Sequence, residues 1–518
     1  MATRMIVVGL DGATFDLIKP WVAEGKLPAF ARLMAEGAHA ELRSTLPLAS
    51  TSTATSAATG KNPGNHGIYD RSRTQGDLHG RRVWDIAAAH GRRVGLVRLP
   101  LTDDTKGMEG GCVISEIPAT NGVDGDVLGI ANVRAFRDEA FDLQRMQNAE
   151  MLNLLGHGEW DLLWVTFDTL GKVQRFFWHY MDPTHPAHPG PSDLGDTILR
   201  SYELVDDCLA EIVKRLDDRT GLLLVSDHGS CAAESYLALA DWLEEAGFQK
   251  THVETGSPVQ RALNGIGKEA YAFLRALRRS GLGWLPNLMP QRPKANLEAT
   301  KASACVVKSI DWSATRVFCQ SAANGGLRVN LRGRESDGIV APEDFDAVRE
   351  EVRTALLQLA DPATGRKVVR AVHLREEIFR GPHLEDGPDL LVETNDPYGI
   401  VEGIAGAVIV PAGRHAGERT GNRTRMGIFI LAGGPARRGA AVPTLDVCDV
   451  APTLLHLMEL PEPADVDGIV AEAALAEAHL AGRPARAAVP TLRDVQTVGT
   501  RDHDRRIVPG TTEGLGYQ

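Results

Sequence analysis

The segment MIVVGLDG, residues 5–12, decides the fold class of this chain. It is an apolar run that ends at Asp11, with glycine at 9 and 12, and this pattern is typical of a strand buried on both faces and followed by a tight turn. Four further apolar runs lie at residues 94–99, 162–167, 222–226 and 427–432, with helix-like segments between them. Strands that alternate with helices predict an α/β fold, in which helices cover both faces of a mostly parallel sheet.

The sequence also predicts how the chain is divided. Residues 1–240 and 381–518 are expected to form two parts of the α/β core, the second with an irregular polar tail from about residue 480. Residues 241–380 are expected to form an inserted cap. This stretch contains a basic helical segment at 271–280, a proline-containing link at 285–293 and a glycine-rich, strand-like part at 325–331.

Charge and composition narrow the classes of partner. The chain has 68 acidic and 56 basic residues and a net charge of -12, which argues against bulk nucleic acid as a ligand. A small anionic substrate in a local basic pocket fits this balance. The sequence is compatible with a homo-oligomer.

Cysteine usage and hydropathy indicate a compartment. The six cysteines form no close CxxC pair, so neither a zinc knuckle nor a redox motif is expected, and reduced thiols are typical of the cytoplasm. No secretory signal is present at the start of the sequence. No apolar stretch reaches the roughly 20 residues that a membrane span needs. We therefore expect a cytoplasmic protein without a membrane partner.

Polar residues follow two of the predicted strands. Asp11 follows the first, and Asp227 and His228 follow the run at 222–226. Ligands of open α/β sheets bind at the carboxyl ends of the strands. Neighbouring Asp and His side chains offer oxygen and nitrogen ligands to one cation. Taken alone, Asp11 also fits a cap, and the Asp-His pair also fits a hydrogen-bonded turn.

Two more segments could bind an anion. Ser50 opens the small-residue segment 50–60, where the first N–H groups of a helix would favour a phosphate. Taken alone, the segment is more typical of an ordinary N-cap on a small-residue helix. The segment GNRTRMG, residues 421–427, precedes the last apolar run and carries Arg423. A solvated basic loop is the alternative interpretation of this second segment.

In this order, the segments resemble the alkaline phosphatase superfamily, in its type I phosphodiesterase and nucleotide pyrophosphatase branch. The family's Ser or Thr nucleophile lies nine residues before a Thr-Gly, which selects Ser50 against Thr59-Gly60. The segment TGKNPGNHGIYD, residues 59–70, is similar to the family's TGxxPxxHGI. Weaker similarities follow in register at residues 174–178, 311–312, 332–335, 387–391, 449–454 and 515–517. The resemblance therefore covers most of the chain.

The resemblance implies one intact metal site. The family binds two metals, and the Asp, Asp and His of one site match Asp11, Asp227 and His228. This set implies one divalent metal, for which zinc, manganese and calcium are candidates.

The expected ligands of the second metal site are replaced by other residues. Its family ligands are an Asp-x-x-x-His pair and a distant His, and these positions are Gly171, Arg175 and Arg423 here. We interpret the two arginines, with Lys172 beside them, as replacing the charge of the missing metal, because a guanidinium binds an oxyanion through two hydrogen bonds. Surface arginines that merely fill the vacancy are one alternative, and a shifted metal site that uses Asp168 or His415 is another.

These assignments predict an enzyme that cleaves or transfers a phosphodiester-, phosphonate- or sulfate-type group through Ser50. Arginine keeps a pKa above about 12 and cannot generate hydroxide, so both hydrolysis and transfer stay open. The expected substrate is a small anionic phospho- or sulfo-ester, nucleotide-like esters included. The alternatives are an anion-binding pseudoenzyme and a phosphoryl mutase or isomerase.

Overall fold

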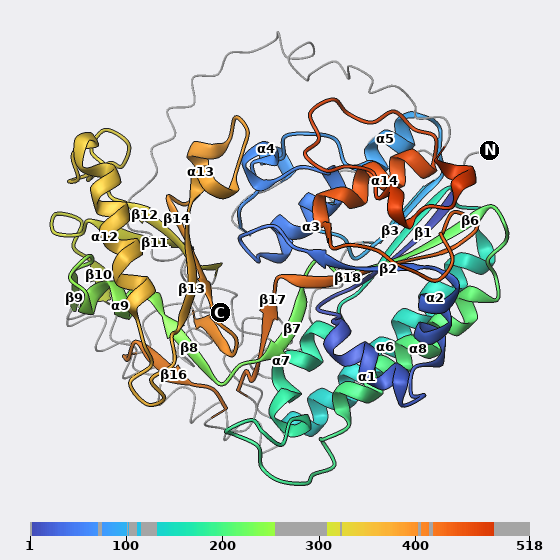
Figure 1. The fold of residues 1–518 in the computed structure, drawn as a ribbon, viewed down its shortest axis with the longest axis horizontal. Helices are drawn as coiled ribbons and strands as arrows, with labels where there is room; N and C mark the ends of the chain where they lie inside the picture. The colour runs from blue at the N-terminus through green and yellow to red at the C-terminus, as the bar shows by residue number, and fades with distance from the viewer. Residues whose placement is uncertain are drawn as a thin grey trace, which may run out of the picture. The chain divides into compact units, whose positions relative to one another are not determined.

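The computed structural model describes residues 3–70, 75–100, 102, 111–114, 132–253, 308–321, 324–401, 406–413 and 418–480 (Figure 1). It confirms the predicted α/β class and each of the five predicted strands. The predictions for residues 271–280, 285–293 and 515–517 and for His415 lie outside the described residues.

A nine-stranded sheet forms the centre of the larger of two compact units, which spans residues 1–242, 319–328 and 347–501. Its order is β19-β2-β18-β6-β1-β5-β3-β4, and β20 pairs with β2. Most neighbours are parallel, whereas β18 runs antiparallel to β6 and β2. The strands are β1 (Arg4–Leu10), β2 (Ala38–Arg43), β3 (Val94–Val97), β4 (Cys112–Ile114), β5 (Leu162–Phe167), β6 (Thr220–Val225), β18 (Met426–Gly433), β19 (Ala440–Ala441) and β20 (Leu445–Asp446).

Helices cover both faces of this sheet, as predicted (Figure 1). Successive residues of a strand point to opposite faces, so Ile6 and Val8 of β1 join one hydrophobic core while Met5 and Val7 join the other. The first core is completed by α1 (Phe15–Ala23), α2 (Pro28–Glu36), α6 (Val133–His157), α7 (Thr169–Met181) and α8 (Thr197–Val213). The second is completed by α3 (Ser50–Thr59), α5 (Val83–Ala89) and α14 (Val450–Leu457).

Smaller sheets and short helices are formed by other described residues, and some of these elements cross the bounds of the two units. A four-stranded sheet has the order β11-β12-β14-β13, a three-stranded sheet has the order β15-β8-β16, and β17 pairs with β7. The strands are β7 (Gly229–Ala232), β8 (Ser235–Ala238), β11 (Val317–Ser321), β12 (Gly326–Val329), β13 (Val369–Leu374), β14 (Leu390–Thr394), β15 (Tyr398–Val401), β16 (Ile409–Pro411) and β17 (Gly421–Thr424). The helices are α4 (Pro63–His66), α9 (Leu239–Glu245), α12 (Phe345–Gln358) and α13 (Arg375–Ile378).

The second compact unit comprises residues 243–318, 329–346 and 502–518. In its described part, β9 (Thr251–Val253) and β10 (Lys308–Ile310) form an antiparallel pair. The side-chain amide of the buried Asn330 donates to the carbonyl oxygens of Trp312, Thr315 and Asp337, which joins residues 312–315 to the turn at 336–337. The predicted cap boundaries at residues 241 and 380 stay a prediction.

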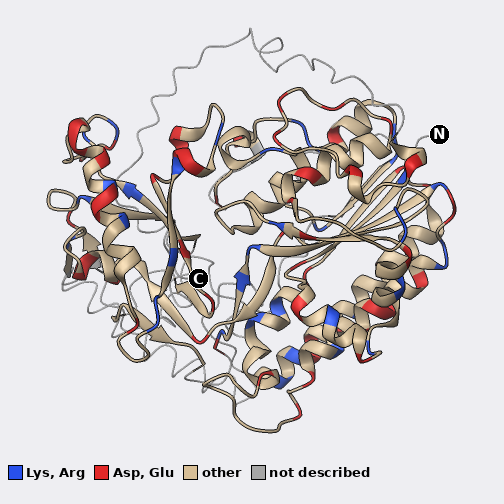
Figure 2. Cartoon of the chain, viewed as in Figure 1, with Lys and Arg blue, Asp and Glu red and all other residues tan. Residues whose placement is uncertain are grey.

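Charged residues are interspersed along the helices of the larger unit (Figure 2). Several are paired one turn apart, as in Arg200–Glu203 and Lys214–Glu211. Exposed pairs of this kind contribute at most about 1 kcal/mol each, so they matter more for the surface than for the fold. Among the described helices, none is both long and apolar enough to cross a membrane.

Candidate active site

The carboxyl edge of the large sheet collects the predicted metal ligands. Asp11 directly follows β1, and Asp227 and His228 lie between β6 and β7. Gly9 pairs with Val225 across the parallel β1–β6 ladder. Asp11 and Asp227 each lie two residues beyond this pair, so the register brings them to the same edge of the sheet.

Asp11 and His228 form the closest pair at this edge. Nε2 of the buried His228 lies 3.0 Å from Oδ1 of Asp11, without hydrogen-bond geometry. Nδ1 of His228 lies 2.9 Å from the carbonyl oxygen of Gly229, which can only accept, so the neutral ring carries its proton on Nδ1. Without a cation, a proton on Nε2 pairs the ring with the carboxylate of Asp11. With Nε2 unprotonated, the two side chains can bind one divalent cation, whose histidine ligands commonly donate their second N–H to a carbonyl.

The charge of Asp11 is stabilised by its surroundings. Burial alone would raise the pKa of Asp11, but contact with His228 and the charges of Arg423 and Arg175 lower this pKa below its usual range. The net effect favours the carboxylate, which is the form that binds a cation.

Asp227 is held by a different partner. Its Oδ2 accepts a short hydrogen bond from the hydroxyl of Thr53, a fully buried residue in the first turn of α3. Within the described ranges, no three His, Cys, Asp or Glu side chains are close enough to one another to hold a metal as they stand. The assignment of Asp11, Asp227 and His228 as one ligand set therefore stays a prediction.

Ser50 is the first residue of α3, and no side chain caps this helix end. The helix ends at Gly60, whose φ of 71° is left-handed and suits glycine, and the N–H of Gly60 donates to the carbonyl of Ser56. A ligand beside the Ser50 hydroxyl would meet the N–H groups at the start of α3.

Arg423 contacts Ser50 directly. The antiparallel β17–β7 ladder pairs Arg423 with Ser230, just beyond Asp227 and His228. From this position Nη2 of Arg423 donates to Oγ of Ser50 at 2.6 Å, and Nη1 donates to the carbonyl of Leu48 at 3.0 Å. The guanidinium therefore binds both the predicted nucleophile and the backbone that leads to it.

Arg175, Lys172 and Asp168 are placed by α7. The half-buried Arg175 lies near enough to Asp11 for its charge to act on the pKa of that carboxyl. Nζ of Lys172 donates to Oδ2 of Asp168 at 2.6 Å, and the other oxygen of Asp168 accepts from Gln147 at 2.7 Å. Both oxygens of Asp168 are thus bound by protein donors, so this placement does not favour a shifted metal site.

Gly171 lies against the carboxylate of Asp11. A Cβ atom at residue 171 would be 2.2 Å from Oδ2 of Asp11, far inside van der Waals contact. Residue 171 is also where the resemblance places an aspartate of the second metal site. In this structure the carboxylate of Asp11 fills the space that such a side chain would enter.

We predict that Gly171→Ala displaces Asp11 and weakens metal binding by about 10- to 100-fold, the range expected when the orientation of a ligand is lost. Equilibrium titration with Zn²⁺ measures this change. Gly156→Ala is the matched control, because a Cβ at this α6 residue would meet nothing within 4 Å. Equal Zn²⁺ affinity in the Gly171 variant and the wild type would show that metal binding by Asp11 does not require glycine at residue 171.

A serine–histidine pair further along α3 resembles a catalytic dyad. Oγ of Ser56 lies 3.0 Å from Nε2 of the buried His66. The N–H of Ile68 donates to Nδ1 of His66, so Nε2 carries the proton and donates to Ser56. Burial, followed by the charges of Lys61 and His383, lowers the pKa of His66 to about 3. This neutral ring joins α3 to α4 and has no lone pair available to remove a proton from Ser56.

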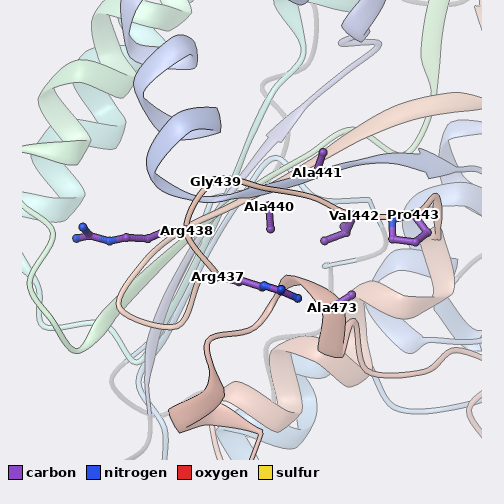
Figure 3. A pocket seen from close by; sticks show the side chains of 8 residues that line it. All are labelled: Arg437, Arg438, Gly439, Ala440, Ala441, Val442, Pro443 and Ala473. Carbon is purple, nitrogen blue, oxygen red and sulfur yellow. The ribbon is translucent and has the colours of Figure 1, made fainter.

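A hollow of about 350 Å³ lies elsewhere on the sheet (Figure 3). Residues 437–443 and Ala473 line it. Because β18 runs from Met426 at the site edge to Gly433 opposite Gly221, the hollow is at the other end of the strands. It is separate from the residues around Ser50.

The sequence interpretation missed Thr53. Its only signal was its position three residues after Ser50, which places both on one face of a helix. Without the fold, nothing connected this threonine with Asp227, which lies 174 residues further along the chain.

Comparisons with known proteins show one matching family profile and several similar solved structures. Residues 5–418 match the sequence profile of the type I phosphodiesterase / nucleotide pyrophosphatase family. Murine ectonucleotide pyrophosphatase/phosphodiesterase 5, solved as an inactive variant with AMP, is 13% identical with a TM-score of 0.47, and the alignment covers 92% of this chain and 100% of that one. The human counterpart is 12% identical with a TM-score of 0.47, with coverages of 88% and 95%. No curated protein sequence matches.

Proposed function

The chain belongs to the type I phosphodiesterase / nucleotide pyrophosphatase family, and we propose that it cleaves or transfers a phosphodiester-, phosphonate- or sulfate-type group through Ser50. The observation that carries this proposal is the 2.6 Å hydrogen bond from Arg423 to Oγ of Ser50. It joins a candidate nucleophile to a permanent cation at an uncapped helix N-terminus.

Ser50 is the group that attacks. The guanidinium of Arg423 stabilises negative charge on Oγ, which favours the alkoxide. The bond from Oγ to phosphorus or sulfur forms as the bond to the leaving oxygen breaks, and the proton lost by Oγ passes through solvent to the leaving oxygen. The first N–H groups of α3 then donate to the oxygens on which charge develops, and Arg423 can turn one N–H from Ser50 to the same oxygens while Leu48 holds the other.

Asp11, Asp227 and His228 are the residues that would hold one divalent cation, with zinc, manganese and calcium as candidates. When bound, such an ion supplies positive charge that lowers the pKa of a hydroxyl and stabilises phosphoryl oxygens. In place of a second ion, Arg175 and Arg423 supply fixed positive charge. Neither arginine can take a proton from water near neutral pH. The group therefore leaves Ser50 either by attack of a water that another base deprotonates or by transfer to an acceptor hydroxyl.

Metal content tests the proposal first. We expect about one Zn²⁺ or Mn²⁺ per chain in the wild type and almost none in Asp227→Ala, because removing a ligand weakens binding by orders of magnitude. Elemental analysis of the full chain after dialysis measures both. Asp142→Ala removes an exposed ion-paired carboxylate and should keep the metal. Two tightly bound ions per chain would contradict the single-metal arrangement.

Turnover tests the second half of the proposal. The panel is bis(4-nitrophenyl) phosphate, 4-nitrophenyl phenylphosphonate and 4-nitrophenyl sulfate, each with and without glycerol as an acceptor. Release of nitrophenol supports cleavage, and a glycerol ester among the products identifies transfer. Saturable binding of these esters without turnover would instead indicate an anion-binding pseudoenzyme.

A further inference from the structure

We propose that Thr53 is a positioning residue that couples the nucleophile Ser50 to Asp227, an inference that rests on the function proposed above. Thr53 is fully buried, and its hydroxyl donates a short hydrogen bond to Oδ2 of Asp227. This bond joins the first turn of α3 to the end of β6.

The direction of this hydrogen bond follows from a count of acceptors. The Thr53 hydroxyl also lies 3.1 Å from the carbonyl oxygen of Ala49 and 3.3 Å from that of Ser50, but it has one proton to donate. The carbonyl of Ala49 already accepts the backbone N–H of Thr53 at 2.9 Å. A carboxylate is the stronger acceptor, so the proton goes to Asp227.

The bond fixes the position of the proposed metal ligand, Asp227, relative to the proposed nucleophile, Ser50. Ser50 and Thr53 are three residues apart on one helix and share a face, so the position of Asp227 relative to Thr53 also sets its position relative to Ser50. Among the described residues, Asp227 has no other hydrogen-bond donor, which leaves Oδ1 for a cation. Thr53 therefore orients a metal ligand and holds it in register with the nucleophile.

Zn²⁺ affinity separates this role from a merely structural one. We expect Thr53→Val, which keeps the shape and loses the hydroxyl, to bind Zn²⁺ about 10- to 100-fold more weakly than the wild type. Thr53→Ser keeps the donor and should stay within about threefold. Competition with a chromogenic chelator measures each affinity on the full chain, and thermal unfolding checks that each variant is folded.

Thr55→Val is the matched control. Thr55 lies on the same helix with a buried side chain, but its hydroxyl bonds the carbonyl of Thr51, away from Asp227. Its Zn²⁺ affinity should equal that of the wild type. If Thr53→Val does not fold, Thr53→Ala, which favours the helix, takes its place with the same expected loss.

The outcomes distinguish the two proposals. If Asp227→Ala loses Zn²⁺ while Thr53→Val retains wild-type affinity, Thr53 has no positioning role and the proposed metal site stands. Equal losses in Thr53→Ser and Thr53→Val would also overturn the inference, because the hydroxyl would then not be the group that matters. If Asp227→Ala binds Zn²⁺ as the wild type does, the proposed metal site itself fails.

Discussion

Replacement of Ser50 by alanine is expected to lower kcat by roughly 10⁴- to 10⁶-fold, as loss of a nucleophile does in other covalent mechanisms. Without Oγ no covalent intermediate forms, and Arg423 loses the Ser50 hydroxyl as a hydrogen-bond acceptor. The fold should be retained because Ser50 is the first residue of α3 and only half-buried. Steady-state rates on the best ester of the panel measure the effect, and mass spectrometry of quenched turnover shows whether the Ser50 peptide carries the group.

Ser56→Ala is the control for this prediction. Ser56 lies on the same helix and contacts His66, yet the direction of its hydrogen bonds makes it a structural residue. We expect its loss to cost about 1–3 kcal/mol of stability, because the buried Nε2–H of His66 loses its acceptor, and to leave kcat within a few fold. A Ser50 variant with wild-type turnover would remove Ser50 from the mechanism, and a Ser56 variant without turnover would move the nucleophile there.

Arg423→Ala is expected to lower kcat by about 10²- to 10³-fold, the effect of removing one donor that stabilises developing charge. Arg423→Lys should recover little of this loss. An ammonium is a compact point charge, and it cannot span Oγ of Ser50 and the carbonyl of Leu48 as the planar guanidinium does. Rates of both variants, with Zn²⁺ at saturation, measure the effect.

Arg438→Ala is the matched control for Arg423. Arg438 is an exposed arginine beside the hollow at the far end of the sheet (Figure 3), and it should leave turnover unchanged. If Arg423→Lys were as active as the wild type, a simple positive charge would suffice and the two-point contact would have no catalytic role. If Arg423→Ala were fully active, the idea that arginine replaces a metal would fail at this position.

Much of the fold was accessible from the sequence because its elements have strong local signals. The apolar runs around Val8, Val165 and Leu224 are buried on both faces, which is why they read as continuous hydrophobic segments. The same logic placed Asp11, Asp227 and His228 at one sheet edge, since parallel strands end on the same side. The family resemblance was confirmed by a profile match that spans most of the chain.

The contacts within the site could not be predicted from the sequence. The bond from Thr53 to Asp227 and the bond from Arg423 to Ser50 join residues that are far apart in the sequence, so no local pattern encodes them. The pairing of Asp168 with Gln147 depends on how α6 packs beside β5. A sequence motif can identify Ser56 and His66 as residues of interest. It cannot show that Nε2 of His66 donates to Ser56, because this follows from the contact of Nδ1 with the N–H of Ile68.

The closeness of Asp11 to Gly171 constrains how this site could change over evolutionary time. An aspartate at residue 171 cannot simply be added, because its first side-chain atom would collide with Oδ2 of Asp11. Asp11 Oδ2 is the free end of a side chain, so an aspartate at residue 171 would go with another position of the Asp11 carboxylate. A return to two ions would therefore link substitutions at residues 171, 175 and 423 to a new position of the Asp11 carboxylate.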